Sequence, residues 1–497
     1  MKRYFLLILI FIVIKSATAS NADSALVEHM TLRQLLQQEA LHNPALHGIC
    51  FQSSFSQLAL GIDLQRQSKA FVPEKGKGYT LPYLEVNTFH HLNDHSAVWG
   101  EASYTTGRKQ DIKWNSTSDY DLLQPYILAD TAGGDTRQER YTISGGYGIR
   151  LNQCLLGAEM LVRAEQEYRG HDPRMRGIVT DLTLRLGCGY QFNHYRIGAT
   201  IEGNIYIQTN SEAFYREEGV IPEYQMTGLG TEYSRFSGDK RSLYYDGGGI
   251  ALLLHAAPVN NNGPFADVRL DEHRYHRKLA EYNSMPLTDL YNEHAGATIG
   301  WRQEKNYSIA IFGHVDYTRR TGNEHVGGTS DARYFPVIAC LTMYKSHILD
   351  TYAGALYGRA NWNVNITAGY RAVSEEYVYP HRQMDASHVY GKLRGQCFIR
   401  PADKWLLTVD VHASYYAKAS DKLNMPLANM DAAFTRLIQH KHKFTTANYT
   451  DFGAKARADY ALNQSRYGLF AEAGGGMTLC SASEHQTALH CSIGITF

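Results

Sequence analysis

The sequence predicts an all-β fold, a transmembrane antiparallel β-barrel of the outer-membrane type. Apolar and polar residues alternate with a period of two along many segments, most clearly from Tyr195 to Gln208. Tight polar joins also alternate with long segments from the first predicted strand to the last, as short periplasmic turns and long extracellular loops do in such barrels. We therefore expect about 18 strands over residues 55–497, within a range of roughly 14 to 18.

The composition supports a barrel and excludes other classes. The 497 residues include 35 Tyr and 43 Gly but only 13 Pro, which suits long strands with aromatic girdles. The 49 Lys and Arg balance the 49 Asp and Glu, so no basic excess would attract nucleic acid. Beyond the N-terminal run, no apolar stretch is long enough for a membrane-spanning helix.

The N-terminus has the order of a secretory signal peptide. Lys2 and Arg3 precede the apolar run 4–14, and the small residues 17–19 follow it, so we expect a signal peptide at residues 1–19. A retained membrane helix is disfavoured because the run is too short to span a bilayer. Residues 20–54 are predicted to be a periplasmic segment with a short helix that begins near Thr31 and ends before Pro44.

One face of each predicted strand suits lipid and the other suits an aqueous lumen. The charged residues and histidines predicted to line the lumen are Glu159, Arg163, Asp181, Arg185, Arg196, Glu202, His314, Asp316, Asp410 and His412. From a turn at residues 191–194, Arg185 would face Thr200 and reach the diagonal Glu202. Two interpretations remain open: a selectivity lining, or salt bridges that stiffen or fill the barrel.

The sequence offers no complete set of catalytic or metal-binding residues. The motifs GxSxG, HExxH and the P-loop are absent, and the nearest fragment is His412-Ala413-Ser414. The histidine pairs lack a clear third ligand, and the seven cysteines have no metal-site spacing. A disulfide between Cys480 and Cys491 is the alternative to free thiols. We predict no enzyme, no cofactor and no metal.

The long segments 109–137, 209–240 and 419–445 are predicted extracellular loops. In the last of these, Phe434, Leu437 and Ile438 have the spacing of an amphipathic helix. Loops of this kind often fold into the mouth of a barrel or dock a partner.

The C-terminal strand, residues 485–497, carries apolar residues on one face and ends on Phe497. This arrangement resembles the signal by which outer-membrane barrels are recognised for insertion. The resemblance implies location in the cell outer membrane, with outer-membrane lipid and the barrel-assembly machinery as partners.

The whole pattern resembles a family of uncharacterised outer-membrane barrels from anaerobic gut Gram-negative bacteria. The resemblance rests on the signal peptide, on Asn43-Pro44-Ala45, on the strand at residues 99–104 and on the closing residues 495–497. It implies a barrel beside a TonB-dependent receptor or a surface lipoprotein. Asn43-Pro44-Ala45 also resembles the N-terminal tripeptide of long-chain fatty-acid transporters, whose barrels have fewer strands than we predict.

Two functions are compatible with these features. The alternating lumen face favours a passive channel or transporter for an unidentified solute. The alternative is a non-catalytic accessory or structural barrel that partners a TonB-dependent receptor or surface lipoprotein, with its lumen occluded by internal loops and salt bridges.

Overall fold

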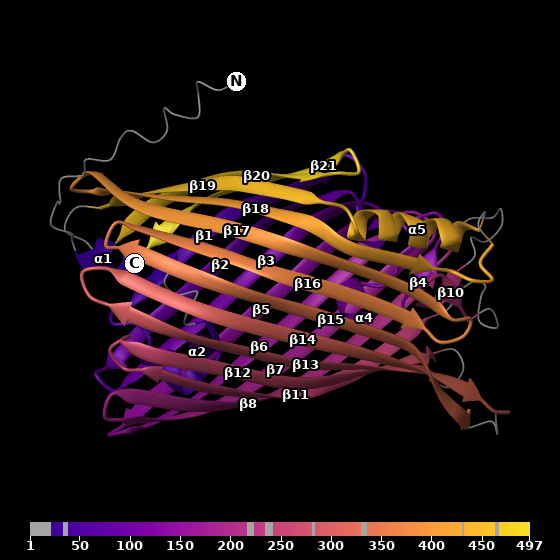
Figure 1. Cartoon of the computed structure of the whole chain (residues 1–497), viewed down its shortest axis with the longest axis horizontal. Helices are drawn as coiled ribbons and strands as arrows, with labels where there is room; N and C mark the ends of the chain where they lie inside the picture. The colour runs from indigo at the N-terminus through magenta and orange to yellow at the C-terminus, as the bar shows by residue number, and fades with distance from the viewer. Residues whose placement is uncertain are drawn as a thin grey trace.

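The structure is a computed structural model that describes residues 21–32, 38–215, 223–233, 242–280, 284–329, 335–429, 432–462 and 467–497. The predicted signal peptide lies outside the described residues. An 18-stranded antiparallel sheet closes into a single barrel, with short turns at one end and the long loops at the other (Figure 1). This confirms the predicted fold class and strand number. Among the described helices, none has the length and apolarity needed to cross a membrane.

The barrel strands follow one another around the wall in chain order. They are β1 (Phe55–Gln67), β2 (Gly78–Asn93), β3 (Ser96–Ile112), β5 (Gly134–Leu151), β6 (Cys154–Arg169), β7 (Arg174–Phe192), β8 (Tyr195–Ala213), β11 (Leu243–Pro258), β12 (Gly263–Leu279), β13 (Met285–Glu304), β14 (Ser308–Gly327), β15 (Val337–Arg359), β16 (Trp362–Tyr377), β17 (Arg382–Ala402), β18 (Trp405–Asn424), β19 (Tyr449–Ala461), β20 (Gly468–Cys480) and β21 (Glu484–Thr496).

The seam of the barrel joins the first strand to the last. β1 pairs with β21 in antiparallel register, from Gln57 opposite Thr496 to Gln67 opposite Gln486. At the periplasmic end, the amides of Ser56 and Phe497 each donate to the other residue's carbonyl, at 2.9 Å. The wall therefore has no open edge along this seam.

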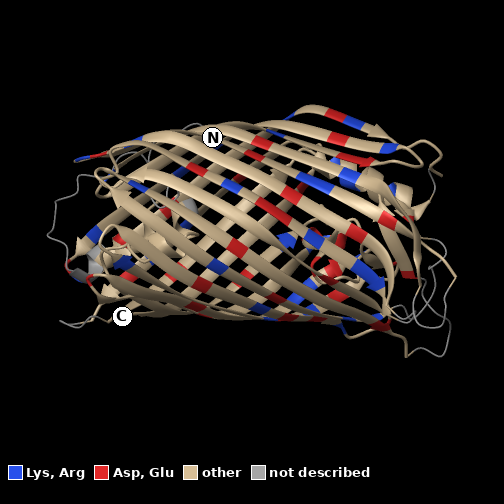
Figure 2. Cartoon of the chain, turned by 90° about the horizontal axis from the view of Figure 1, so that it is seen from below, with Lys and Arg blue, Asp and Glu red and all other residues tan. Residues whose placement is uncertain are grey.

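The two faces of the wall follow the alternation in the sequence. Ile201 on β8 is 65% exposed toward lipid, whereas its neighbour Glu202 is only 5% exposed and points into the barrel. Tyr190, Trp301 and Tyr307 are exposed near the short turns, as expected for an interfacial girdle. Acidic and basic residues are interspersed along the strands (Figure 2).

Two details of the wall differ from or sharpen the sequence analysis. β15 is one long strand of 23 residues, which begins just after Pro336. The predicted pairing of Arg185 with Thr200 is wrong, because the β7–β8 turn consists of Asn193 and His194 alone. Asn193 adopts a positive φ of 46° there, and the tighter turn places Arg185 directly opposite Glu202.

The remaining elements lie at the two ends of the barrel. α1 (Asn21–Met30), α2 (Gln38–Leu41) and α3 (Pro44–His47) are at the periplasmic end; part of the helix predicted from Thr31 falls on residues 33–37, outside the described residues. The extracellular end holds the 3₁₀ turn η2 (Pro73–Lys75), α4 (Tyr120–Leu123) and α5 (Ala433–Thr445). It also holds a second sheet of β4 (Leu128–Asp130), β9 (Glu223–Gly228) and β10 (Thr231–Glu232). α5 confirms the helix predicted from Phe434, Leu437 and Ile438.

Candidate functional site

The extracellular mouth is filled by the chain's own loops. We define the extracellular closure as residues 73–75, residues 113–133, residues 223–233 and α5. Its buried residues, including Leu123, Ile127 and Met226, pack in one apolar cluster with wall residues such as Tyr245 and Leu290. Burial of this much apolar surface stabilises the closure inside the mouth.

Arginines on the wall hold the extracellular closure from several directions. On β6, Arg169 forms an ion pair of 2.9 Å with Asp130 on β4, and both side chains are fully buried. On the same strand, Arg163 donates two hydrogen bonds, of 2.9 and 2.8 Å, to Asp119. Bidentate arginine–carboxylate pairs such as Arg163–Asp119 fix the position of the carboxylate as well as contributing energy.

Three more wall arginines bind backbone carbonyls of the closure. Arg277 on β12 donates to Met226 at 3.0 Å, and Arg320 on β14 donates to Asp121 at 2.8 Å. Arg382 on β17 donates to Leu229 at 2.8 Å. The closure is therefore attached to strands around much of the wall.

Titratable groups within the extracellular closure are tightly coupled to it. Burial alone would raise the pKa of Asp119, but its hydrogen bonds with Arg163 outweigh burial and lower the pKa. Burial would lower the pKa of Lys441 on α5, but the carboxylates of Glu375 and Glu74 raise it. Burial raises the pKa of the Glu74 carboxyl itself. Lys441 Nζ lies 3.0 Å from Glu375, which fastens α5 to β16.

The periplasmic mouth is crossed by the N-terminal segment. We define the periplasmic closure as residues 21–32 and 38–54. The side-chain nitrogen Nδ2 of Asn43 donates to the backbone carbonyls of Cys188 on β7 and Ala199 on β8, both at 3.2 Å. On the opposite wall, Leu32 N donates to Gln396 on β17 at 2.8 Å. β7–β8 and β17 lie on opposite sides of the closed sheet, so the segment spans the mouth.

Lumen-facing glycines make room for α3 against the wall. A Cβ built at Gly157 would lie 2.3 Å from the carbonyl carbon of Pro44, and one at Gly187 would lie 2.3 Å from the Asn43 side-chain oxygen. A Cβ at Gly148 would lie 2.8 Å from the Gly48 Cα. A fourth glycine, Gly198, also faces Asn43. These four positions form a glycine cradle, which admits the helix only because its members lack side chains.

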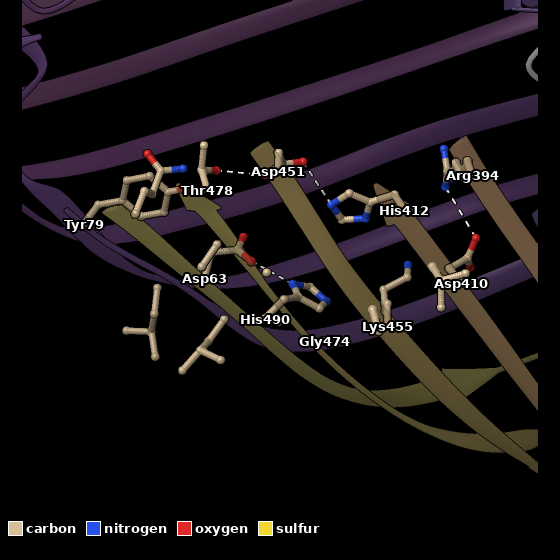
Figure 3. A pocket seen from close by; sticks show the side chains of 18 residues that line it. Asp63, Tyr79, Arg394, Asp410, His412, Asp451, Lys455, Gly474, Thr478 and His490 are labelled. Atoms are coloured by element: carbon tan, nitrogen blue, oxygen red, sulfur yellow. Dashed lines mark hydrogen bonds and ion pairs between the residues drawn. The ribbon is translucent and has the colours of Figure 1, made fainter. Parts of the chain in front are cut away.

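A pocket of about 410 Å³ with both polar and apolar lining residues lies on the wall formed by β17–β21, β1 and β2. Figure 3 shows side chains from several of these strands converging on it. Its polar lining comprises Asp63, Tyr79, Arg394, Asp410, His412, Asp451, Lys455, Thr478, Gln486 and His490. Gly474 and Gly476 on β20 leave the wall without side chains on the pocket side.

Ion pairs fix the orientation of the pocket's polar groups. His490 bridges two carboxylates, with Nδ1 2.6 Å from Asp63 and Nε2 2.9 Å from Glu472. Lys455 binds the same Glu472 at 3.1 Å. His412 lies 3.3 Å from Asp451. The pocket thus presents cationic, anionic and neutral groups whose geometry is set before any solute arrives.

The predicted lining residues fall into several groups. Arg185 bridges Glu159 at 3.0 Å and Glu202 at 2.6 Å, and Arg163 binds Asp181 at 3.0 Å. Asp316 binds His294 at 2.7 Å and lies 3.9 Å from His314. Asp410 and His412 are in the pocket, whereas Arg196 lies at the periplasmic end, opposite Gln191. Their role as a selectivity lining stays a prediction.

The structure places a carboxylate, that of Asp451, beside the fragment His412-Ala413-Ser414. Asp451 on β19 lies beside His412 and pairs in register with Ser414. Within the described parts of the chain, no hydrogen bond joins His412 to Ser414. In the same parts, no three His, Cys, Asp or Glu side chains are placed to hold a metal ion. All seven cysteines are free thiols, so Cys480 and Cys491 are not joined.

Sequence reasoning missed the pocket residues contributed by the chain ends. Asp63, Asp451, Lys455 and His490 come from β1, β19 and β21, which meet only when the barrel closes. The sequence did contain a pattern that could have identified them, because each of these residues lies at a lumen-facing position between two outward-facing residues of its strand. Asp63, for example, lies between Ile62 and Leu64.

Comparison with known proteins identifies the family. Residues 44–497 match the family of unknown function DUF6850. The chain belongs to this family. The match confirms the predicted membership of an uncharacterised family, and the structure shows its barrel fold. No curated protein matches the sequence.

Several solved structures have a similar barrel. The ferric preacinetobactin receptor BauA from Acinetobacter baumannii has 9% identity and a TM-score of 0.40, over 90% of this chain and 80% of its own. The ferric yersiniabactin uptake receptor FyuA from Yersinia pestis has 8% identity and a TM-score of 0.45, over 90% and 80%. The copper transporter OprC has 9% identity and a TM-score of 0.42, over 88% and 80%. At these values the likeness does not indicate a solute.

Proposed function

We propose that the chain is an outer-membrane transporter that passively admits a small polar solute to the lumenal pocket. The observation that carries this proposal is the pocket itself: a cavity with fixed charged groups inside a barrel whose two ends are closed by the chain. Movement of one closure at a time would pass a bound solute without leaving an open pore.

The pocket chemistry favours a solute with both donor and acceptor groups. Asp63 and Asp451 accept hydrogen bonds, Lys455 and Arg394 donate them, and Tyr79 adds an aromatic ring. A zwitterionic or polyhydroxylated molecule would complement these groups with hydrogen bonds, whereas an apolar solute would form none with them.

Reconstitution of the mature chain tests the proposal. We expect wild-type protein in planar bilayers to show no large steady conductance. In liposomes we expect saturable uptake of some members of a panel of sugars, amino acids and dipeptides. Asp63→Asn combined with Asp451→Asn should change the uptake rate or preference. Asp403→Asn, the same chemical change in an exposed periplasmic turn, is the control.

Two results would count against a transporter. One is that no solute in the panel enters wild-type liposomes, although a variant with a displaced closure conducts ions. The other is that uptake is the same in the pocket variant and the control.

The filled extracellular mouth favours a second candidate, an accessory barrel. Because the closure is fastened to the wall, the loops form a fixed surface to which a TonB-dependent receptor or a surface lipoprotein would dock. Cross-linking in native outer membranes, followed by purification, should then recover one stoichiometric partner. A lone monomer after mild solubilisation would argue against this candidate.

The same proposal places the chain in the outer membrane after removal of residues 1–19. Outer-membrane lipid would cover the apolar belt, and the barrel-assembly machinery would read the strand that ends in Phe497. The exposed ring of Phe497 at the periplasmic rim supports this role. Deletion of Phe497 should lower outer-membrane levels, as measured by fractionation and heat-modifiable mobility.

A further inference from the structure

The hairpin of β14 and β15 runs past its neighbours at the extracellular end (Figure 1). β15 begins at Val337, but its pairing with β16 begins only at Tyr344 opposite Tyr377. The Met343 carbonyl accepts a bond from Val378 N, which caps β16. Within the described residues, Val337–Thr342 therefore have β14 on one side and no strand on the other. We call these residues the free edge.

The free edge has the uncharged, apolar composition typical of a strand with neighbours on both sides. Its sequence is VIACLT, with no charged residue, no proline and no glycine. Ile338 is 71% exposed, Leu341 is 50% exposed and Val337 is 42% exposed. The pairing with β14 shifts register between Gly322 and Asn323 and between Val326 and Gly327, so an irregularity lies at each end of the free edge, but the exposed side chains along it are apolar. An exposed apolar edge is a template for another strand unless charges or a covering segment block it.

A second unpaired edge in the same protein is protected in that way. β18 continues past its last pair with β19, Tyr416 opposite Tyr449, through residues 417–424. That stretch carries Lys418, Asp421 and Lys422. Lys418 N donates to the Asn448 side chain at 2.7 Å, and His442 of α5 lies 3.6 Å from Asp421. Within the described residues, the chain thus charges and covers this edge but leaves the free edge apolar and uncovered.

We propose that the free edge is a docking site for an extended, uncharged segment of another polypeptide, which adds to β15 as a strand. Backbone hydrogen bonds would give affinity, and side chains on alternating positions would meet the apolar faces. The proposal is independent of what crosses the lumen.

The size of the free edge favours a flexible segment over a second barrel. The six residues span only about 20 Å. Two rigid barrels that touched along this strip alone would bury far less than the roughly 1,600 Å² typical of a stable complex. An extended segment can pair its backbone with the whole edge, which a second barrel held off by the projecting hairpin cannot do.

A generic strand peptide tests the proposal with purified full-length protein. The probe is a short labelled peptide of alternating valine and threonine, and the control probe has proline at its centre. We expect saturable binding of the first probe by fluorescence anisotropy, and slower amide hydrogen exchange at residues 337–342 when it binds. The proline probe should bind roughly tenfold more weakly or not at all.

Matched substitutions locate the binding site. Ile338→Lys and Leu341→Lys place a charge on opposite faces of the free edge, and each should weaken binding roughly tenfold or more. Leu427→Lys is the control, because Leu427 is 85% exposed in the loop after β18. Heat-modifiable mobility checks that each variant forms a closed barrel.

Three outcomes would overturn the proposal. They are equal binding of the two probes, equal binding by the edge variants and the control, and absence of any binding to the wild type. Formation of a wild-type dimer cross-linked through Cys340, abolished by Ile338→Lys, would instead identify a second copy as the occupant.

Discussion

The two ends of the lumen are closed by the same chain on different physical principles. At the extracellular end, large side chains reach inward from the wall, and arginines bind the closure through charged hydrogen bonds. At the periplasmic end, the backbone of α3 lies against glycines, while Phe51 and Leu26 pack on wall side chains such as Trp99 and Phe398. The first closure combines an apolar cluster with buried ion pairs, whereas the second relies on small apolar clusters and close approach to glycines. We therefore expect the periplasmic closure to be the easier one to displace.

The largest effect is expected from breaking the buried ion pair of Arg169. Arg169→Met leaves the Asp130 carboxylate uncompensated in a fully buried site, which should cost the extracellular closure about 3 to 5 kcal/mol. Faster amide exchange over residues 113–133 and a new conductance in planar bilayers would show it. Arg169→Met combined with Asp130→Leu should restore part of the protection, because the lone Asp130 charge is removed while the nearby buried Glu212 still lacks the arginine. Unchanged exchange in the single variant would mean that charge does not hold this closure.

A smaller effect is expected from filling the glycine cradle. Gly157→Val places side-chain atoms where the Pro44 carbonyl lies, so overpacking should destabilise the docked segment by about 1 to 3 kcal/mol. Chymotrypsin should then cleave near Phe51 faster than in the wild type. The control is Gly203→Val, because a Cβ at Gly203 meets no atom within 4 Å. Equal cleavage of the two variants would contradict a closure that depends on shape.

Removal of the Asn43 side chain should weaken the periplasmic closure less than Gly157→Val does. Asn43→Ala loses the bonds to Cys188 and Ala199 and the N-cap bond to Ala45, at a cost of about 1 kcal/mol. The same proteolysis assay should place this variant between the wild type and Gly157→Val. Cleavage faster than in Gly157→Val would show that hydrogen bonds outweigh shape at this end.

The smallest effect concerns Glu74 and pH. Its pKa is raised by burial, so the folded closure holds this proton more tightly than the unfolded chain does. The contribution of Glu74 is therefore most favourable below its ordinary pKa of 4.5 and is lost as pH rises through the raised value. Glu74→Gln should slow exchange over residues 113–133 at pH 7 but leave it unchanged below 4.5. The opposite trend would mean that the charge pair with Lys441 dominates.

The strands and their faces were predictable because the barrel repeats one local rule. Period-two alternation identified the lipid face at Ile201 and the lumen face at Glu202, and helical spacing identified α5. The register of Arg185 was missed because turn length is set by the local backbone of Asn193 and His194 rather than by alternation.

Loops that occlude the lumen were one of the predicted alternatives, but the N-terminal insertion, the individual contacts of the closures and the pocket were not predictable, because they depend on contacts between distant residues. Insertion of the N-terminal segment is visible only when Gly148, Gly157, Gly187 and Gly198 lie side by side on four strands. The partnership of Asp63 with His490 joins residues 427 positions apart. No local pattern in the sequence encodes such a distance.

The pairing of Ser56 with Phe497 has a kinetic consequence. The wall becomes continuous only when the first and last strands meet, so the loop that must be closed runs from residue 56 to residue 497. Such non-local pairing is entropically costly and slow to find. Until that moment β1 and β21 each expose unpaired backbone groups, which lipid cannot satisfy. The last strand must therefore be synthesised before the barrel closes, and an assembly factor that held the first strand until then would shorten the time for which these groups stay unpaired.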